Sequence, residues 1–223
     1  MGILLAFGVD AAWEWSQDRG QEREYLEAIG SELEQGLALW PGSVEAGNRA
    51  LHSHVALLSQ FQGETLPPAD SLMYWLAGLS RPLLFDSPRA VLDDVLSSGG
   101  TQVIRSDGLR LSIGTYRRLL ARTELITAQA WATWEQRVQP YLEGPVPRVE
   151  RLRRGPYSLS VEIPFAASRF EPDFEALFRD PAFESMIAER WIRTNTWRVI
   201  LDQVEAEMVG IVDLIAEELG SGS

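Results

Sequence analysis

The last part of the chain carries the pattern that most restricts the fold, because its apolar residues recur with the period of a helix packed against other helices. The apolar positions follow alternating steps of four and three, and they are Trp197, Leu201, Val204, Met208, Ile211 and Ile215. This spacing places one continuous apolar stripe along a helix, as in the seam of a bundle or coiled coil. Before it, Asp180 and Pro181 provide a capping residue and a proline at the first helical position. We therefore expect a long C-terminal helix that ends near Gly220.

A second helical pattern runs from Trp13 to about Trp40. Its apolar residues recur at spacings of three and four, and they are Leu26, Ile29, Leu33, Leu37 and Trp40. Charged residues fill the other faces, and those that we expect in water are Glu22, Arg23, Glu24, Glu27, Glu32 and Glu34. Pro41 and Gly42 then interrupt the pattern, and Ser43 can cap a new helix. The apolar residues of that helix are Val44, Leu51, Val55, Leu58 and Phe61. The sequence therefore predicts a break or kink near Pro41.

A third long helical pattern begins after Ser106 and Asp107 and stops at Gly144. Residues 148–167 are the least helical part of the chain, and we expect them to form a surface excursion. Alternating apolar residues within this stretch predict a short extended segment, and they are Tyr157, Leu159, Val161 and Ile163.

Two short helices are expected between the long ones. Asp70 or Ser71 can cap the first, which ends near residue 79, and Ser87 with Pro88 can begin the second, which ends at Gly99. No repeat of fixed period is visible. The sequence thus predicts an all-α fold, an elongated helical bundle of three to four long helices with short helical insertions. Residues 1–15 are expected to be a membrane anchor or interfacial segment, residues 16–219 the bundle domain and residues 220–223 a flexible tail.

Composition excludes several classes of function. The formal net charge of −12 repels polyanions, so nucleic acid is not an expected partner. All 20 basic residues are Arg, which excludes lysine nucleophiles, Schiff bases and the P-loop lysine. The chain has no Cys, which excludes disulfides, thiolate nucleophiles and zinc–thiolate sites.

The N-terminal segment has the composition of a membrane anchor. Its apolar and aromatic residues are Ile3, Leu4, Leu5, Phe7, Val9, Trp13 and Trp15. Tryptophan suits the boundary between hydrocarbon and headgroups, and an acid- and Arg-rich pattern follows directly. The apolar run is shorter than the roughly 20 residues that a crossing needs. It also has neither a basic leader region nor a small-residue cleavage site, so it is not read as a cleaved signal peptide.

Three interpretations of this segment remain: a shortened membrane span, an interfacial anchor, or an apolar helix end buried against a partner. Core of a soluble bundle is the alternative without a membrane. The acidic residues that follow outnumber Arg19 and Arg23, and they are Asp10, Glu14, Asp18, Glu22, Glu24 and Glu27. Because basic residues are retained on the cytoplasmic side, a flank this weakly basic favours a domain on the periplasmic side of a bacterial inner membrane.

Three blocks of the chain carry a resemblance to a known family, and they are Ile3–Gln35, Val91–Ile113 and Phe174–Trp191. The first passes from an apolar run into an Arg- and Glu-rich helix with a Tyr25–Leu26 step, and the second has a Ser-Gly turn before a polar helix start. Together they resemble an uncharacterised family of bacterial single-pass membrane proteins of unknown function. The resemblance implies an N-terminal anchor followed by an all-helical domain.

Candidate catalytic and metal-ligating residues are few. His52 and His54 are the only histidines, and their spacing of two places them on different faces of a helix. Asp93 and Asp94 are adjacent and also diverge, so a glycosidase pair is not expected. No Gly-x-Ser-x-Gly elbow and no Glu-x-x-His pair occurs. We expect no catalytic residue, metal or cofactor.

Two groups of residues could still bind something. Trp131 and Trp134 lie one helical turn apart and could line a pocket for a pigment, quinone or lipid, although such a stripe is more often core or interface. The basic cluster could dock an acidic partner or lipid headgroups, and it consists of Arg148, Arg151, Arg153 and Arg154. Four polar residues interrupt the apolar face of the last helix, and they are Arg190, Arg193, Thr194 and Asn195. An inward Arg would need a carboxylate or amide partner, and a structural polar layer is the default interpretation.

These observations favour a non-catalytic, membrane-associated helical scaffold or accessory subunit of a larger membrane protein complex. Its partners would be the bilayer, transmembrane helices of that complex, or both. A ligand-binding or enzymatic helical bundle is the first alternative. A homodimeric interaction module, a homo-oligomer zipped through the C-terminal seam, is the second.

Overall fold

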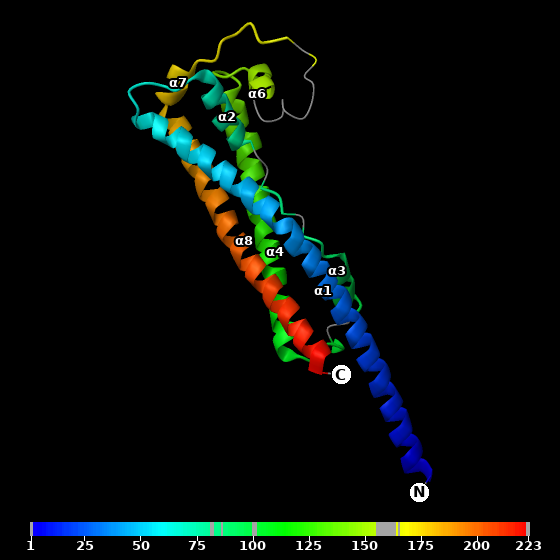
Figure 1. The fold of residues 1–223 in the computed structure, drawn as a ribbon. Helices are drawn as coiled ribbons and strands as arrows, with labels where there is room; N and C mark the ends of the chain where they lie inside the picture. Colours follow the sequence, from blue (N-terminus) through cyan, green and yellow to red (C-terminus); the bar gives the residue numbers. More distant parts are fainter. Residues whose placement is uncertain are drawn as a thin grey trace. The chain divides into compact units, whose positions relative to one another are not determined.

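The computed structural model describes the backbone of residues 2–80, 83–85, 87–99, 102–154, 164 and 166–221, and their side chains except for residues 2–18, 154 and 221. In this part of the chain all regular structure is helical and no strand occurs. Three long helices dominate: α1 (Gly2–Ser59), α4 (Asp107–Thr133) and α8 (Pro181–Ser221) (Figure 1). The prediction of an all-helical fold is confirmed.

Short helical segments connect the long helices. They are η1 (Gln60–Gln62), α2 (Ala69–Leu79), α3 (Ala90–Ser97), η3 (Trp134–Val138), α5 (Gln139–Leu142), α6 (Arg148–Arg154) and α7 (Phe174–Phe178). The helix predicted to stop at Gly144 is confirmed, since α4, η3 and α5 follow each other without a gap from Asp107 to Leu142. Within it, η3 is a π-helical stretch, which has a wider turn than an α-helix.

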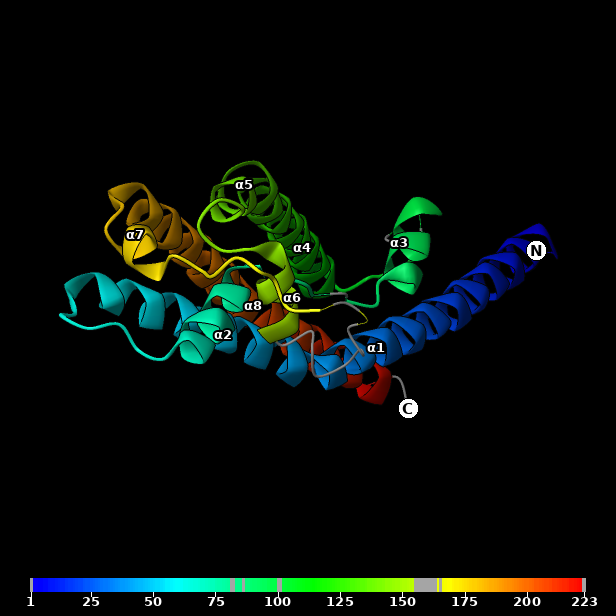
Figure 2. The same ribbon diagram turned by 90° about the horizontal axis from the view of Figure 1, so that it is seen from above.

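The chain divides into two compact units. Unit 1 comprises residues 1–41, 85–121 and 202–223, and unit 2 comprises residues 42–84 and 122–201. The helices α1, α4 and α8 each contribute residues to both units. Unit 1 adds α3, and unit 2 adds α2, α5, α6 and α7, with α2 packed beside α6 (Figure 2).

Unit 1 is held by the predicted apolar faces. Its buried apolar side chains include Leu26, Ile29 and Leu33 of α1, Leu109, Ile113 and Tyr116 of α4, and Val204, Met208, Ile211 and Ile215 of α8. A Cβ atom at Gly36 would lie 3.3 Å from the sulfur of Met208, so α1 and α8 are in close contact there. All six seam residues are buried within the chain, and they are Trp197, Leu201, Val204, Met208, Ile211 and Ile215. A second copy would therefore need another surface.

Two glutamates predicted to face water are buried in unit 1. The carboxylate of Glu32 accepts the backbone N–H groups of Val91 at 2.8 Å and Leu92 at 2.9 Å. The carboxylate of Glu22 accepts the N–H of Arg105 at 2.6 Å. Because these N–H groups belong to a helix start and a loop, they need acceptors from elsewhere in the fold. The prediction of solvated glutamates was wrong at both positions.

The start of α3 also differs from the prediction. Arg89, not Ser87, occupies the N-cap position, and no side chain of the neighbouring sequence caps the helix. The hydroxyl of Ser87 instead lies 2.6 Å from the hydroxyl of Tyr116. A local cap is unnecessary because Glu32 already accepts the exposed N–H groups.

The predicted break at Pro41 does not occur, and Ser43 does not begin a new helix, because α1 continues through both residues. A proline inside a helix removes one backbone hydrogen bond, which tertiary packing can offset. Just before it, Trp40 is buried and packs edge-on against Phe85 with ring centroids 5.1 Å apart. In unit 2, a Cβ atom at Gly47 would lie only 2.9 Å from the Trp197 ring.

Unit 2 has its own apolar core. It includes Leu57, Leu72, Met73, Leu76, Trp134, Val138, Leu142, Phe178, Phe183 and Ile187. The apolar face predicted for this part of the chain is correct in part. Leu58 and Phe61 pack against the core, whereas Val55 is exposed and Ser53 and His54 are buried. Small residues allow α1 and α2 to approach each other closely, since a Cβ atom at Gly78 would lie 2.3 Å from the Cβ of Ser53.

Helix boundaries in unit 2 confirm one prediction and correct two. Asp180 accepts the N–H of Ala182 at 2.8 Å and starts α8 at Pro181, as predicted. Pro68 holds the N-cap position of α2, so neither Asp70 nor Ser71 caps it. Residues 148–154 form helix α6 in place of the predicted irregular excursion, with backbone bonds from Glu150 and Arg151 to the carbonyl of Pro147. The predicted extended segment at 157–163 lies outside the described residues.

Candidate functional site

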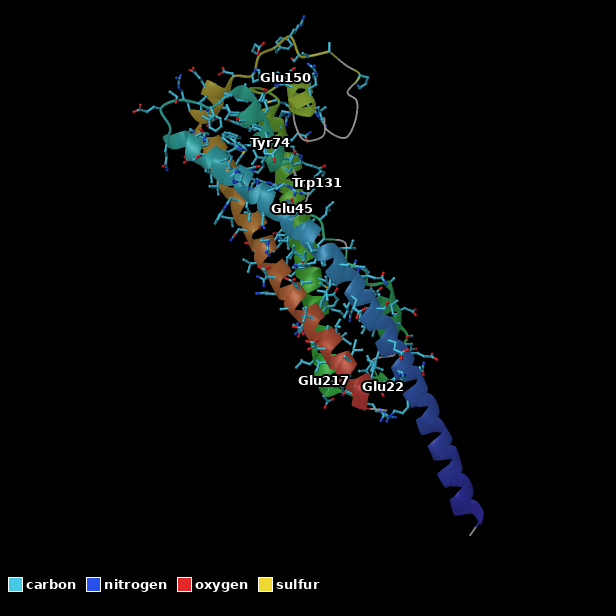
Figure 3. All side chains as sticks on the ribbon, viewed as in Figure 1. Glu22, Glu45, Tyr74, Trp131, Glu150 and Glu217 are labelled. Atoms are coloured by element: carbon cyan, nitrogen blue, oxygen red, sulfur yellow. The ribbon has the colours of Figure 1, made fainter. Side chains whose placement is uncertain are left out.

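Unit 2 contains a pocket of about 360 Å³ between α2, α6 and the α4–η3–α5 helix. We call it the Trp–Arg pocket, and its lining residues are Leu76, Ala77, Ser80, Trp131, Trp134, Glu135, Gln139, Arg148, Arg151 and Leu152. Trp131 on α4 is labelled in Figure 3. The pocket thus joins the two residue groups that the sequence singled out separately, the tryptophan pair and the basic cluster.

The tryptophan pair forms an aromatic part of the lining. Trp134 is 7% exposed and belongs to the unit 2 core, whereas Trp131 is 46% exposed. Trp134 is also the first residue of the π-helical stretch, whose wider turn changes the angle between successive side chains. Trp134 is therefore core, whereas Trp131 is not, and both contribute to one pocket.

The arginine side of the pocket lies on α6. The Nε and Nη2 atoms of Arg151 are buried, and no group in the described part of the chain accepts a hydrogen bond from them. Burial and then the positive charge of Arg148 lower the pKa of Arg151, while Glu143 acts in the opposite direction. Arg148 is exposed and lies 4.0 Å from a carboxylate oxygen of Glu143. The pocket therefore holds more positive than negative charge around Arg151.

The pocket lining carries two arginines and one glutamate, Glu135. The hydroxyl of Ser80 donates to the carbonyl of Ala77 at 2.8 Å. Glu135 is exposed and lines the pocket, but within the described residues it makes no ion pair with Arg148 or Arg151. The arrangement combines a cationic end with an aromatic wall, which suits binding more than proton transfer.

The other members of the basic cluster behave differently. Arg153 lies 3.9 Å from the carboxylate of Glu150, and the side chain of Arg154 lies outside the described ones. Glu150 is buried on α6 (Figure 3), and its Oε1 accepts the N–H of Ser168 at 2.7 Å. Sequence reasoning missed this role, because a glutamate among arginines looks like an exposed charge. Arg148 and Arg151 thus line the pocket, whereas Arg153 contacts Glu150.

A second polar cluster lies buried elsewhere in unit 2. Arg190 of α8 is almost fully buried, and its Nη1 donates to the carbonyl of Ala130 at 2.6 Å. The sequence predicted a carboxylate or amide partner for an inward-facing Arg, and the carbonyl of a backbone amide accepts this hydrogen bond. His54 is also buried, and burial followed by the charge of Arg190 lowers the pKa of His54 to about 3. This histidine is neutral at physiological pH.

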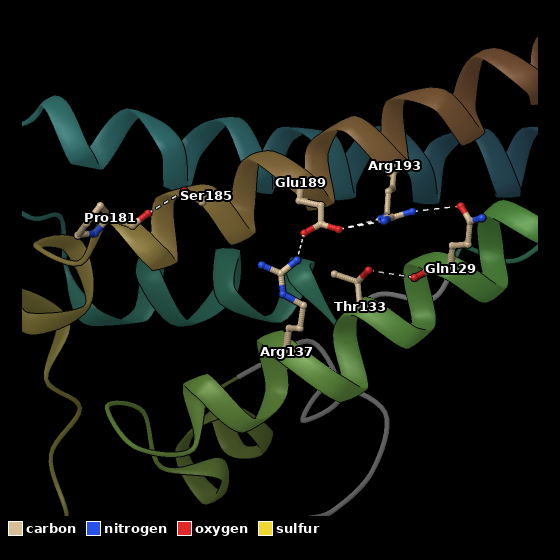
Figure 4. A network of polar contacts seen from close by, with 7 residues as sticks. All are labelled: Gln129, Thr133, Arg137, Pro181, Ser185, Glu189 and Arg193. Carbon is tan, nitrogen blue, oxygen red and sulfur yellow. Dashed lines mark hydrogen bonds and ion pairs between the residues drawn. The ribbon is translucent and has the colours of Figure 1, made fainter.

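Glu189 links α8 to the α4–η3 helix. Its carboxylate contacts Arg137, and Arg193 Nη2 lies 2.9 Å from Glu189 Oε1 (Figure 4). Arg193 also donates to the side-chain oxygen of Gln129 at 3.1 Å. The hydrogen bond from Arg193 is the largest cause that lowers the pKa of Glu189. Each polar side chain here has a partner, so we assign the cluster a structural role.

The remaining candidates do not converge on a site. His52 is exposed while His54 is buried, and Asp93 and Asp94 are both exposed. Among the described residues, no group of three or more His, Cys, Asp or Glu side chains could hold a metal ion. The side chains of the predicted anchor lie outside the described ones, and they are Ile3, Leu4, Leu5, Phe7, Val9, Trp13 and Trp15.

In the described part of the chain, no helix is both long enough and apolar enough to cross a membrane. Residues 1–18 are not covered, so the anchor stays a prediction. The chain matches no protein-family model, and no significantly similar curated protein or solved structure is found. The family resemblance also stays a prediction.

Proposed function

We propose that this protein is a non-catalytic, membrane-associated helical scaffold or accessory subunit of a larger membrane protein complex. Residues 3–15 contact the bilayer, transmembrane helices of that complex, or both, and the folded part lies on the periplasmic side of a bacterial inner membrane. The proposal includes the family resemblance and the absence of an enzymatic activity. The observation that carries it is the continuity of α1 from Gly2 to Ser59.

This continuity supports a mechanical link between the anchor and the fold. The helical rise gives residues 2–18 a length of roughly 25 Å. Directly beyond them, Glu22 and Glu32 of the same helix accept backbone N–H groups of unit 1. An apolar helix end held in a membrane would therefore hold unit 1 at a set distance from it.

An exposed apolar strip on α8 supports a docking role for unit 2. Ile192 and Val199 are two helical turns apart, and their exposed fractions are 57% and 49%. Residues spaced by seven lie on the same face of a helix, about 10 Å apart along its axis. One face of α8 thus presents two exposed apolar side chains that a partner could cover.

Purification from native membranes in mild detergent tests the proposal. We expect a companion protein in stoichiometric amount, and a variant with Leu4→Glu and Phe7→Glu should lose both the companion and membrane association. The exposed helical substitutions Glu24→Gln and Glu27→Gln serve as the control, because they leave the apolar segment intact. A wild-type protein that migrates alone, or an anchor variant that stays in the membrane fraction, would contradict the proposal.

A second candidate function is ligand binding by the helical bundle, and the Trp–Arg pocket is the specific observation that favours it. The two functions are compatible, since accessory subunits can carry small molecules. A small-molecule titration of the purified protein tests this candidate independently of the first.

A further inference from the structure

We propose that the Trp–Arg pocket binds a small organic monoanion with a flat apolar body, such as an aromatic carboxylate. The inference rests on the second candidate function, ligand binding, and specifies its ligand class. It draws on three properties of the pocket: its unpaired arginine, its tryptophan-containing wall and its volume.

The charge of the ligand follows from Arg151. Buried nitrogen atoms in folded proteins nearly always have a hydrogen-bond partner, yet Nε and Nη2 of Arg151 have none among the described residues. These two nitrogens lie on one edge of the guanidinium plane, where they can donate in parallel to the two oxygens of a carboxylate. A bound carboxylate would therefore satisfy both donors.

Arg148 adds to this preference. It lines the same pocket, and its contact with Glu143 is long, at 4.0 Å, and exposed to water. An ion pair of this kind contributes little free energy, so Arg148 remains able to attract a bound anion. Glu135 is also part of the lining and repels excess negative charge. A single negative charge fits this balance better than a dianion.

The apolar body of the ligand follows from the rest of the lining. Trp131 and Trp134 provide aromatic surface, and Leu76, Ala77 and Leu152 provide aliphatic surface. Aromatic rings pack favourably in offset or edge-to-face arrangements, so a flat ring suits these indoles. Covering the exposed part of Trp131 would add apolar burial.

The volume limits the size of the ligand. At about 360 Å³ the pocket falls at the small end of the range of known ligand sites. This favours a compact ring system over a two-chain lipid. The π-helical stretch that supplies Trp134 is a second indication, because such stretches are frequent at functional sites.

Calorimetric titration of the purified full-length chain at pH 7 tests the inference. The probes are 1-naphthoate, which is anionic, and 1-naphthalenemethanol, its neutral counterpart of similar shape. We expect 1-naphthoate to bind at least tenfold more tightly than the alcohol, and Arg151→Met to remove that preference. Arg153→Met is the matched control, because it removes the same charge from the same helix but does not line the pocket.

Trp131→Leu is the second variant, chosen because a half-exposed side chain can be changed with little effect on the fold. It should weaken both probes by a similar factor, since it removes ring contact and leaves the charge. Circular dichroism of each variant verifies folding. If Arg151→Met fails to fold, the preference for 1-naphthoate in wild type and Trp131→Leu still decides the charge of the ligand.

The outcomes separate the inference from the function on which it rests. Equal binding of both probes by wild type, weakened by Trp131→Leu, would overturn the anion preference and leave ligand binding intact. Binding of 1-naphthoate that Arg153→Met weakens as much as Arg151→Met would assign the effect to general charge and overturn the inference. If neither probe binds wild type, both the inference and the second candidate function fail.

Discussion

Arg190 Nη1 donates a hydrogen bond to the backbone carbonyl of Ala130 across 2.6 Å, which ties α8 to α4 inside unit 2. The guanidinium is almost fully buried, and burial followed by the charge of Arg193 lowers the pKa of Arg190 to about 10. Arg190 is therefore still charged at neutral pH. Its charge acts on His54, which must stay neutral in the folded state.

The neutral His54 predicts a loss of stability in mild acid. The pKa of His54 is about 3 in the folded protein and 6.5 in the unfolded chain, so the unfolded chain binds the proton first. Stability is thus fully present above pH 6.5 and falls at lower pH, by up to about 1.4 kcal/mol per pH unit. Urea unfolding at pH 7.5 and 5.5 should show the loss in wild type and a much smaller one in His54→Leu.

His52→Leu is the matched control, because this histidine is exposed on the same helix. The free energy of unfolding of this variant should depend on pH as that of wild type does. An unchanged pH dependence in His54→Leu would show that another group controls stability in this range.

Removing the Glu32 carboxylate should destabilise unit 1. Glu32→Ala leaves the N–H groups of Val91 and Leu92 without their acceptor, and we expect a cost of about 1–3 kcal/mol in the free energy of unfolding. Glu34→Ala, at an exposed position of the same helix, should change it by less than about 0.5 kcal/mol. Chemical denaturation measures both, and equal effects would argue against a capping role for Glu32.

The contact between α1 and α2 should not tolerate a side chain at residue 78. Gly78→Ala places a Cβ atom 2.3 Å from the Cβ of Ser53, and the resulting displacement should cost about 1–3 kcal/mol. Ser53→Gly in the same chain should recover part of that loss, which a double-mutant cycle measures. The control is Gly210→Ala, where the added Cβ meets no atom within 4 Å, and this variant should stabilise α8 by up to about 1 kcal/mol. Additive effects of the two changes at 53 and 78 would refute the clash.

Replacing Pro41 should strengthen α1. Pro41→Ala restores a backbone N–H inside a continuous helix and removes the ring, so thermal unfolding should move to higher temperature, with a gain of about 1–3 kcal/mol. The control is Ala38→Gly, at an exposed position of the same helix, which should cost about 1 kcal/mol. A lower unfolding temperature for Pro41→Ala would mean that the packing of α1 against other helices requires the backbone geometry that the proline imposes.

Local signals predicted those features that depend on neighbouring residues. The seam from Trp197 to Ile215 is buried as its spacing requires, and the start of α8 at Pro181 follows from the Asp180 cap. Ser106 likewise precedes α4, where its hydroxyl accepts the N–H of Leu109 at 3.4 Å. Helical periodicity and caps act within a few residues, so the sequence displays them directly.

The errors share a different cause. Glu32 looks like a surface charge because its partner Val91 is 59 residues away in the chain. Pro41 looks like a helix end because the packing around α1 that offsets its lost hydrogen bond comes from distant segments. Residues 148–154 look irregular because two prolines precede them and four of the seven residues are arginines, yet they form a helix. For Glu32 and Trp40, the partner is a segment distant in the sequence.

Patterns in the sequence were therefore enough to predict a helical fold, the courses of α4 and α8, and a concentration of positive charge near residue 150. The tertiary structure decided that Arg151 and Trp131 line one pocket, and that Glu22, Glu32 and Glu150 are buried acceptors. The physical reason is the range of the interactions. Helix formation is decided within a turn or two, whereas burial, a lowered pKa or an unpaired donor depends on which distant segments the fold brings together.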